Sequence, residues 1–158
     1  MKKVAIAISF ICLFIFFDTT EAHTPPFTLI DFIKVYATAH KISPDLVIAM
    51  IRVESSGNSR AISSANCRGL MQVSHAIWKI FMKEPWEDVF DPLLNIQCGI
   101  KYLSDLSKTH NSLEKVLRTY HSGNPNTKSL ATARYVKKVL YQAKMAPDIR
   151  WKERKEKE

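Results

Sequence analysis

The chain has 158 residues, of which 46% are hydrophobic and 24% are charged. These proportions are typical of a globular protein of one domain, and they exclude a collagen-like chain, a coiled coil and a disordered tail. Its 23 lysine and arginine residues against 15 aspartate and glutamate residues give a formal net charge of +8. This charge favours a polyanionic partner, but nucleic acid, anionic lipid and acidic cell-wall polymer all satisfy it.

The first 22 residues have the pattern of a secretory signal peptide. Lys2 and Lys3 precede a continuous apolar stretch, 4–17, and the small residues Thr20 and Ala22 indicate cleavage after Ala22. The apolar stretch is shorter than the roughly twenty residues that a membrane-spanning helix needs, with an uncleaved anchor as the alternative. We therefore expect a periplasmic or secreted protein.

Export affects how Cys67 and Cys98 are interpreted. Two thiols in an oxidising compartment tend to pair, and the alternative is that both are buried as small apolar side chains. Neither cysteine has a second Cys or His two to four residues away, and the five histidines show no ligand spacing. The sequence therefore predicts no metal and no cofactor.

From residue 27 onward the apolar residues recur at helical spacing, with helix-end residues between them. Ser43, Asp91 and either Ser112 or Asn111 are expected N-caps, and Gly123 is expected to end a helix. The predicted class is all-α, with helices over about 28–40 and 44–55, from 74, from 92, over 112–120 and over 128–145. The first is expected to pack through Leu29, Ile33, Tyr36 and Ala37, and the last through Ala131, Tyr135, Val139 and Gln142.

The expected organisation is a signal peptide, 1–22, one domain, 23–146, and a charged C-terminal tail, 147–158. The last residues, 151–158, alternate Lys, Arg and Glu and offer little to bury. They are predicted to be a frayed helix end or a solvated tail, with a docking tail for a partner as the alternative.

Glu54 is a carboxyl group within an apolar helical pattern. It lies four residues after Met50 and three after Ile51, on the face that those residues direct into the core. Burial there raises the pKa of a carboxyl group, which suits a general acid near neutral pH. The alternative is a glutamate at a helix end that bends out to water.

Four ordered blocks of sequence surround this acid. They are Glu54-Ser55 with Ala61 and Ser63, then Gly69-Leu70-Met71-Gln72, then Asn95-Ile96 with Gly99 and Tyr102-Leu103, and finally 120–123 with Tyr135-Val136. In these blocks the chain resembles the Slt-type lytic transglycosylases, bacterial enzymes with a goose-lysozyme-like domain that cleave the glycan of peptidoglycan. The resemblance covers about residues 29–144 and implies a lysozyme-like single domain.

The resemblance also implies roles for individual residues. Glu54 matches the family's single catalytic acid and base, which acts between N-acetylmuramic acid and N-acetylglucosamine and leaves a 1,6-anhydro end. Ser63, Met71 and Gln72 match positions that line the glycan groove. Tyr120 and Tyr135 match tyrosines near the acid, where a phenol orients it, although both could instead be ordinary core aromatics.

The chain departs from the family pattern at three positions. His121 stands where asparagine is usual, so a contact to sugar is lost, remade or made sensitive to pH. Asn66 and Cys67 replace the usual Gly-Ala before the Gly-Leu-Met-Gln motif. Because Cys67 lies beside this motif and Cys98 lies on the helix of the third block, we predict a Cys67–Cys98 disulfide that links the two.

The sequence leaves two alternatives to a lytic transglycosylase. One is a lysozyme-like muramidase that transfers the glycan to water, and the other is an inactive peptidoglycan-binding scaffold. Small members of the family often accompany secretion, pilus or conjugation machines, so components of such an assembly are possible partners besides peptidoglycan. Nucleic-acid binding is disfavoured, and the protein is expected to be a monomer.

Overall fold

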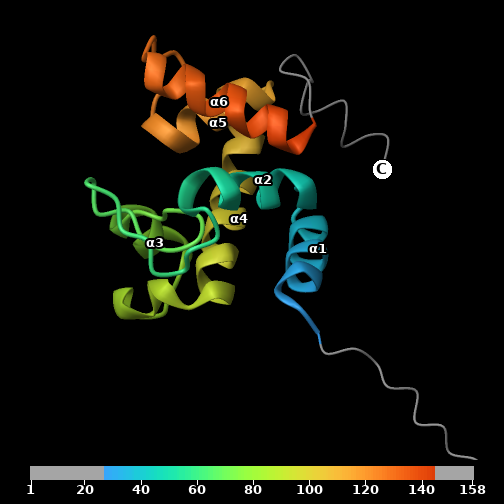
Figure 1. Ribbon diagram of the computed structural model, residues 1–158, viewed down its shortest axis with the longest axis vertical. Coiled ribbons are helices and arrows are strands. Elements are labelled where there is room, and N and C mark those ends of the chain that lie inside the picture. Colours follow the sequence, from blue (N-terminus) through green and yellow to red (C-terminus); the bar gives the residue numbers. More distant parts are fainter. Residues whose placement is uncertain (1–26, 145–158) are drawn as a thin grey trace, which may run out of the picture.

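A computed structural model describes residues 27–144 of the chain (Figure 1). Over this range the fold is helical and contains no β-strand, which confirms the predicted all-α class. The signal peptide, 1–22, and the charged tail, 147–158, lie outside the described residues. The elements are α1 (Leu29–Ala39), α2 (Pro44–Ser55), α3 (His75–Phe81), the short 3-10 helix η1 (Trp86–Phe90), α4 (Pro92–Thr109), α5 (Leu113–Ser122) and α6 (Leu130–Ala143).

Polar side chains begin most of these helices where the sequence predicts. Thr28 forms a reciprocal capping box with Asp31 at the start of α1. The Asp91 carboxylate accepts a hydrogen bond from the Leu94 amide at 2.9 Å and so begins α4. Ser43 precedes α2 but makes no capping hydrogen bond through its side chain, so Pro44 in the first turn supplies the local preference for a helix there.

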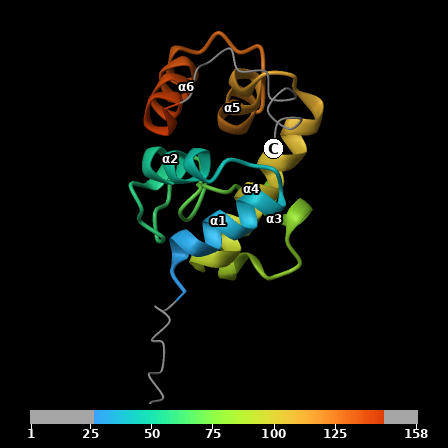
Figure 2. The ribbon, with the colours of Figure 1, turned by 90° about the vertical axis from the view of Figure 1, so that its right-hand side faces the viewer.

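Helix α2 crosses the middle of the molecule, with α5 and α6 on one side of it and α1 and α3 on the other (Figures 1 and 2). Helix α4 is the longest, with 18 residues, and it runs past α2 from one side to the other. The core forms around α2, which packs against α6 and α1, and around α4, which packs against α1 and α5. Its fully buried side chains include Leu46, Val47, Met50, Ile96, Ile100 and Leu103.

Two of the expected packing faces are wrong at their first residue. On α6, Tyr135 and Val139 are buried as predicted, but Ala131 is exposed and its neighbour Thr132 is buried. On α1, Leu29 is 38% exposed although Ile33 and Ala37 are buried. Both residues lie in a first turn, where the chain is only beginning to contact the core. None of the helices described over 27–144 is long and apolar enough to cross a membrane.

The loop between α2 and α3 folds back on itself beside the C-terminal end of α2. Two isolated bridges pair Arg68 with Ile62 and with Val73, which the helical periodicity of the sequence did not indicate. The loop is fastened to α4 by Asn95, whose fully buried amide donates to the carbonyl oxygens of Arg68 and Val89 and accepts from the Met71 amide at 2.8 Å. A single side chain of α4 thus fixes the conformation of the Gly-Leu-Met-Gln motif.

Candidate active site

Glu54 lies in the last turn of α2, where the apolar face of the helix brings it toward the core. Burial raises the pKa of its carboxyl group to about 7, because the charged form loses hydration. A group with this pKa is protonated in a large fraction of molecules at neutral pH and can also hold a negative charge there. It can therefore both donate and accept a proton in one reaction.

Tyr135 of α6 is the side chain that acts most directly on Glu54. Its hydroxyl lowers the pKa of the carboxyl group and so opposes part of the effect of burial. The hydroxyl is buried, yet it completes no hydrogen bond of ordinary geometry with any residue in 27–144. Burial and the neighbouring Glu54 raise the pKa of Tyr135 well above its usual value, so the phenol stays protonated and acts as a donor.

Tyr120 of α5 links this helix to the loop that carries the Gly-Leu-Met-Gln motif. Its hydroxyl donates to the main-chain oxygen of Met71 at 2.9 Å, although the two residues are 49 apart in the sequence. This hydrogen bond joins α5 to the loop between α2 and α3 that carries the Gly-Leu-Met-Gln motif, called the motif loop below. The ring of Tyr120 lies 5.1 Å from the ring of Tyr102 on α4, centroid to centroid. Burial raises the pKa of Tyr120 well above its usual value, and Glu54 adds to this increase. The phenol is therefore neutral and lies within electrostatic range of the acid.

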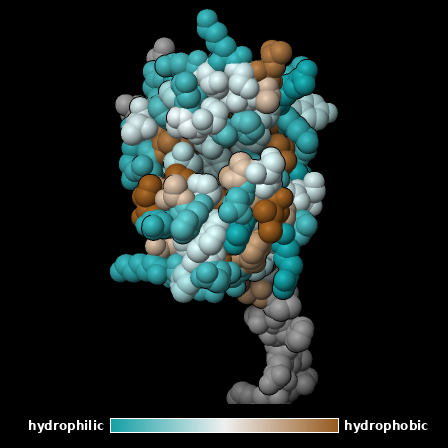
Figure 3. Space-filling model, turned by 90° about the vertical axis from the view of Figure 1, so that its left-hand side faces the viewer, coloured by the Kyte–Doolittle hydropathy of each residue, from teal (hydrophilic) through white to brown (hydrophobic). Residues whose placement is uncertain are grey.

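A cavity of about 280 Å³ opens between α5 and the motif loop. Tyr120 lines this cavity, whereas Glu54 and Tyr135 do not. Because Glu54 acts electrostatically on Tyr120, this tyrosine lies between the cavity and the acid. Among the described residues, no aspartate or glutamate lines the cavity. On the face drawn in Figure 3, which includes the side where α2 ends, most apolar side chains lie at mid-height. The lining residues are Cys67, Gln72, Val73, Ser74, Ala76, Ile77, Tyr102, Tyr120, His121 and Gly123.

The structure separates the three groove residues expected from the motif loop. Gln72 lines the cavity, and its amide nitrogen donates to the carbonyl oxygens of Gly69 and Ala61 at 3.0 and 3.2 Å. Met71 is fully buried against Gly99 of α4 and does not line the cavity, so its side chain packs in the core. Ser63 does not line the cavity, and its hydroxyl accepts a hydrogen bond from the Cys67 amide at 3.1 Å within its own loop.

His121 lines the cavity at the end of α5. Its Nδ1 lies 3.1 Å from the Thr132 hydroxyl oxygen, and its ring lies 4.4 Å from the Tyr135 ring, centroid to centroid. Burial lowers the pKa of His121, so the imidazole is more readily neutral than a free histidine. The residue that replaces the family's asparagine therefore contacts both the cavity and the tyrosine that faces Glu54.

The structure does not contain the predicted disulfide between Cys67 and Cys98, since both residues carry free thiols. Cys98 is fully buried on α4, and this burial raises the pKa of its thiol to about 12. A thiol of this kind is a poor nucleophile, because the thiolate is the reactive form. Cys98 is thus the buried apolar side chain that the sequence left as the alternative, whereas Cys67 lines the cavity.

Several residues that shape the site had no assigned role in the sequence. Tyr102, Ser74 and Ile77 line the cavity, and Asn95 holds the motif loop from below. The Asn-Ile-x-x-Gly pattern was the signal for Asn95, since it places a polar residue on the buried face of an otherwise apolar helix. No comparable signal indicates Ser74, which the sequence presents as an ordinary helix N-cap.

Comparison with known proteins gives a family match over most of the domain. Residues 31–141 match the family model described as the transglycosylase SLT domain. A membrane-bound lytic murein transglycosylase E of Buchnera aphidicola is 32% identical over 92 residues, which are 53% of this chain and 42% of that protein. A putative soluble lytic murein transglycosylase of Haemophilus influenzae is 36% identical over 89 residues, which are 52% of this chain and 15% of that protein.

These relatives are longer than the matched region, so the chain spans less than half of their length. The fold is also similar to solved structures. An inactive mutant of the lytic transglycosylase Slt from Pseudomonas aeruginosa superposes with a TM-score of 0.67 and 21% identity, over 81% of this chain and 26% of that one. The 70-kDa soluble lytic transglycosylase in complex with bulgecin A gives 0.65 and 23%, over 75% and 24% of the two chains. The fold is therefore lysozyme-like, and by the family match over 31–141 the chain belongs to the transglycosylase SLT domain family.

Proposed function

We propose that the protein is a peptidoglycan lytic transglycosylase, a carbon–oxygen lyase that cleaves the β-1,4 bond between N-acetylmuramic acid and N-acetylglucosamine. The observation that carries the proposal is the half-buried carboxyl group of Glu54, with a pKa near 7, together with a cavity lined by Tyr120, whose phenol lies within electrostatic range of this acid. No other carboxylate contributes to the pKa of Glu54, and no acid lines the cavity in the described part of the chain. Family membership supports the same activity.

A single carboxyl group is sufficient for this reaction if the substrate supplies the remaining groups. Glu54 donates its proton to the bridging oxygen, and the bond from C1 of the muramic acid to that oxygen breaks. The carbonyl oxygen of the neighbouring N-acetyl group stabilises the positive charge that develops at C1. The Glu54 carboxylate then accepts the proton of the 6-hydroxyl while O6 bonds to C1. The products are the 1,6-anhydro end and a free N-acetylglucosamine end, and Glu54 is protonated again.

Tyr135 and Tyr120 support this role because the first affects the pKa of Glu54 and the second lies within electrostatic range of it. The Tyr135 hydroxyl has no ordinary hydrogen bond in the described residues and lowers the pKa of Glu54, so it is available to stabilise the carboxylate. Tyr120 lines the cavity and also lies within electrostatic range of Glu54, and its raised pKa keeps the phenol neutral. We propose that Gln72, Tyr120 and His121 contact the glycan. Ser63 and Met71 support the loop that carries Gln72.

We further propose that the protein acts in the periplasm or outside the cell, where its substrate lies. The signal pattern at residues 1–22 supports export, and the named relatives are murein transglycosylases described as membrane-bound or soluble. We also propose that its activity serves local opening of the cell wall for an envelope-spanning machine of secretion, pilus assembly or conjugation. Pull-down of such a component by the exported protein from envelope extracts is the test of this part.

The activity is tested by incubating residues 23–158 with purified sacculi and weighing the released muropeptides. We expect 1,6-anhydro ends, and Glu54→Gln should reduce their release by about 10²- to 10⁴-fold, the usual contribution of a general acid. Glu87→Gln is the matched control, because Glu87 is an exposed residue of η1. Reducing ends in place of anhydro ends would show a muramidase, and sacculi that are bound but uncut by the unaltered protein would show a scaffold.

A further inference from the structure

The positive charge of the described domain is concentrated in its last two helices and the residues that join and follow them. Residues 27–112 contain nine basic and eight acidic residues and are nearly neutral. Residues 113–144 contain a single acid, Glu114, against seven basic residues. Six of these are exposed and are together called the basic face, namely Lys115, Lys128, Arg134, Lys137, Lys138 and Lys144.

The cations of the basic face are not neutralised by neighbouring acids. Arg118, the seventh basic residue, pairs with Glu114 at 2.8 Å and also donates to the Thr127 carbonyl oxygen. Over residues 27–144 the six residues of the basic face form no ion pair. Uncompensated charges of one sign repel each other and attract a partner of the opposite sign.

An apolar groove of about 380 Å³ lies within this charged surface, between α5 and α6. It is lined by Glu114, Arg118, Ala133, Val136, Lys137, Leu140 and Tyr141. The side chain of Tyr141 is 84% exposed, so an aromatic ring stands free at the edge. Among the described lining residues Arg118 pairs with Glu114, so Lys137 supplies the unpaired positive charge at the groove, and Arg134 and Lys138 lie on the same helix. An apolar groove beside these cations fits a ligand that combines alkyl groups with carboxylates.

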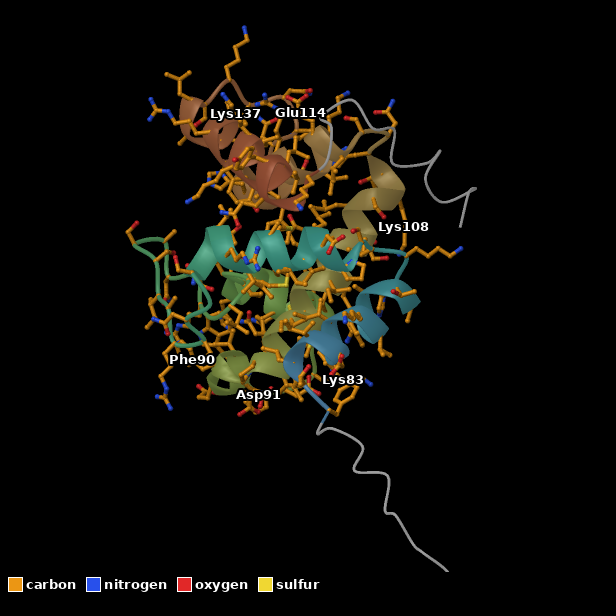
Figure 4. The ribbon with its side chains drawn as sticks, turned by 45° about the vertical axis from the view of Figure 1, so that its right-hand side comes forward. Lys83, Phe90, Asp91, Lys108, Glu114 and Lys137 are labelled. Atoms are coloured by element: carbon orange, nitrogen blue, oxygen red, sulfur yellow. The ribbon has the colours of Figure 1, made fainter. Side chains whose placement is uncertain are left out.

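The groove and the candidate active site share α5 but no lining residue. Tyr120 and His121 line the active-site cavity, whereas Glu114 and Arg118 line the groove. Figure 4 shows Glu114 and Lys137 together at one end of the molecule, while Lys83 and Asp91 lie at the other end. A helix with its side chains is about 10 Å across, so a glycan in the cavity lies within peptide reach of the basic face.

We infer that the α5–α6 basic face and its groove form a second binding surface, which takes the carboxylate-bearing peptides attached to peptidoglycan strands. This inference rests on the proposed function, since it takes peptidoglycan as the target. Stem peptides combine alkyl side chains with free carboxylates, which matches the groove and the cations beside it. Binding at this surface holds the enzyme on the wall while the separate cavity contacts the glycan.

The test measures binding without turnover, in protein carrying Glu54→Gln so that the sacculi stay intact. Arg134→Glu/Lys137→Glu/Lys138→Glu reverses three charges of the basic face. The matched control, Lys34→Glu/Lys79→Glu/Lys83→Glu, makes the same change of net charge on exposed residues of α1, α3 and the segment after α3. Each protein is sedimented with intact sacculi and with sacculi whose peptides have been removed by an amidase.

We expect the parent protein to bind intact sacculi about tenfold more tightly than peptide-free sacculi, and this difference to shrink between 50 and 300 mM salt by screening. The basic-face variant should bind both materials equally, while the control variant should keep the difference. Circular dichroism checks the fold, and a triple glutamine variant replaces the triple glutamate variant if that one does not fold.

The proposal is overturned if peptide removal leaves the affinity unchanged, or if both triple variants weaken binding equally. It is also overturned if the basic-face variant loses only its binding to phosphatidylglycerol vesicles, because the face would then contact a membrane. Release of anhydro muropeptides by protein with intact Glu54 is scored separately. Failure of that assay alone would remove the proposed activity and leave the binding comparison standing.

Discussion

The rings of His121 and Tyr135 lie 4.4 Å apart, centroid to centroid, and are tilted by 31°. Because the Tyr135 hydroxyl acts on Glu54, the imidazole is separated from the acid by one phenol ring. The Thr132 hydroxyl, 3.1 Å from His121 Nδ1, fixes the orientation of the imidazole. Helices α5, α6 and α2 thus each contribute one side chain to a continuous row that ends at the carboxyl group.

Tyr135→Phe should move the pH dependence of activity. The hydroxyl lowers the pKa of Glu54, so its removal lets the pKa rise above about 7. The limb of the kcat/KM profile in which activity falls with increasing pH should therefore shift to higher pH, and the rate at neutral pH should decrease about tenfold because the acid is less well oriented. Tyr141→Phe, at an exposed tyrosine, is the control. A profile identical to that of the unaltered protein would contradict the role of Tyr135.

Glu54→Gln should stabilise the fold, and more so at alkaline pH. The pKa of Glu54 is about 7 in the folded protein and near 4.5 when the chain is unfolded, so the folded state binds the proton more tightly. The free energy of unfolding of the unaltered protein therefore falls as the pH rises from about 4.5 to 7. Urea denaturation should show the variant more stable by about 2–3 kcal/mol at pH 8 and nearly equal at pH 4. Equal stability at both pH values would mean that Glu54 is not desolvated.

His121 should contribute to the pH dependence of stability with the opposite sign to Glu54, and His121→Asn tests this. Burial lowers the pKa of His121, so the folded protein binds fewer protons than the unfolded chain between this lowered pKa and about 6.5. The stability that comes from a neutral His121 is present above 6.5 and is lost as the pH falls through this window. The difference in unfolding free energy between the unaltered protein and the variant should thus be larger at pH 8 than at pH 5. A constant difference would show that His121 does not titrate with folding.

Gly69→Ala should be far more destabilising than Gly57→Ala. Both glycines have positive φ, +79° at Gly69 and +83° at Gly57, so both substitutions carry the backbone cost of about 1 kcal/mol. An added Cβ at Gly69 would overlap the Asn95 amide and lie 2.9 Å from the Val89 oxygen, whereas at Gly57 it would meet nothing within 4 Å. Thermal unfolding should show a loss of about 3–5 kcal/mol at Gly69 and about 1 kcal/mol at Gly57. Equal losses would place the cost in the backbone alone.

The sequence predicted the helices well because their ends carry strong local signals. Asp91 with Pro92, Ser112 and Gly123 each satisfy a helix terminus with a nearby atom or a suitable backbone angle. Ala131 and Leu29 were misplaced because a helical repeat does not say where a helix first reaches its neighbours. The bridges of Arg68 with Ile62 and Val73 were missed because their partners are set by the tertiary fold.

For the site, the sequence identified which residues gather but not which way each of them faces. The apolar pattern made Glu54 a candidate, and the resemblance in the motif blocks selected it together with Tyr120 and Tyr135. Met71 was expected in the groove, yet its side chain fills the space that Gly99 leaves in the core. The two residues belong to different motif blocks, so their contact could not be inferred from the spacing within either block.

The hydrogen bond from Tyr120 to the Met71 carbonyl oxygen has a consequence for how this domain can diverge. Its acceptor belongs to the main chain, which every amino acid supplies, so substitutions at position 71 leave the acceptor in place. The donor is a phenol, and no other common side chain reaches as far with a neutral hydroxyl. The link between α5 and the motif loop is therefore sensitive to substitution at one end only, and loss of Tyr120 would remove this hydrogen bond while Asn95 still holds the loop to α4.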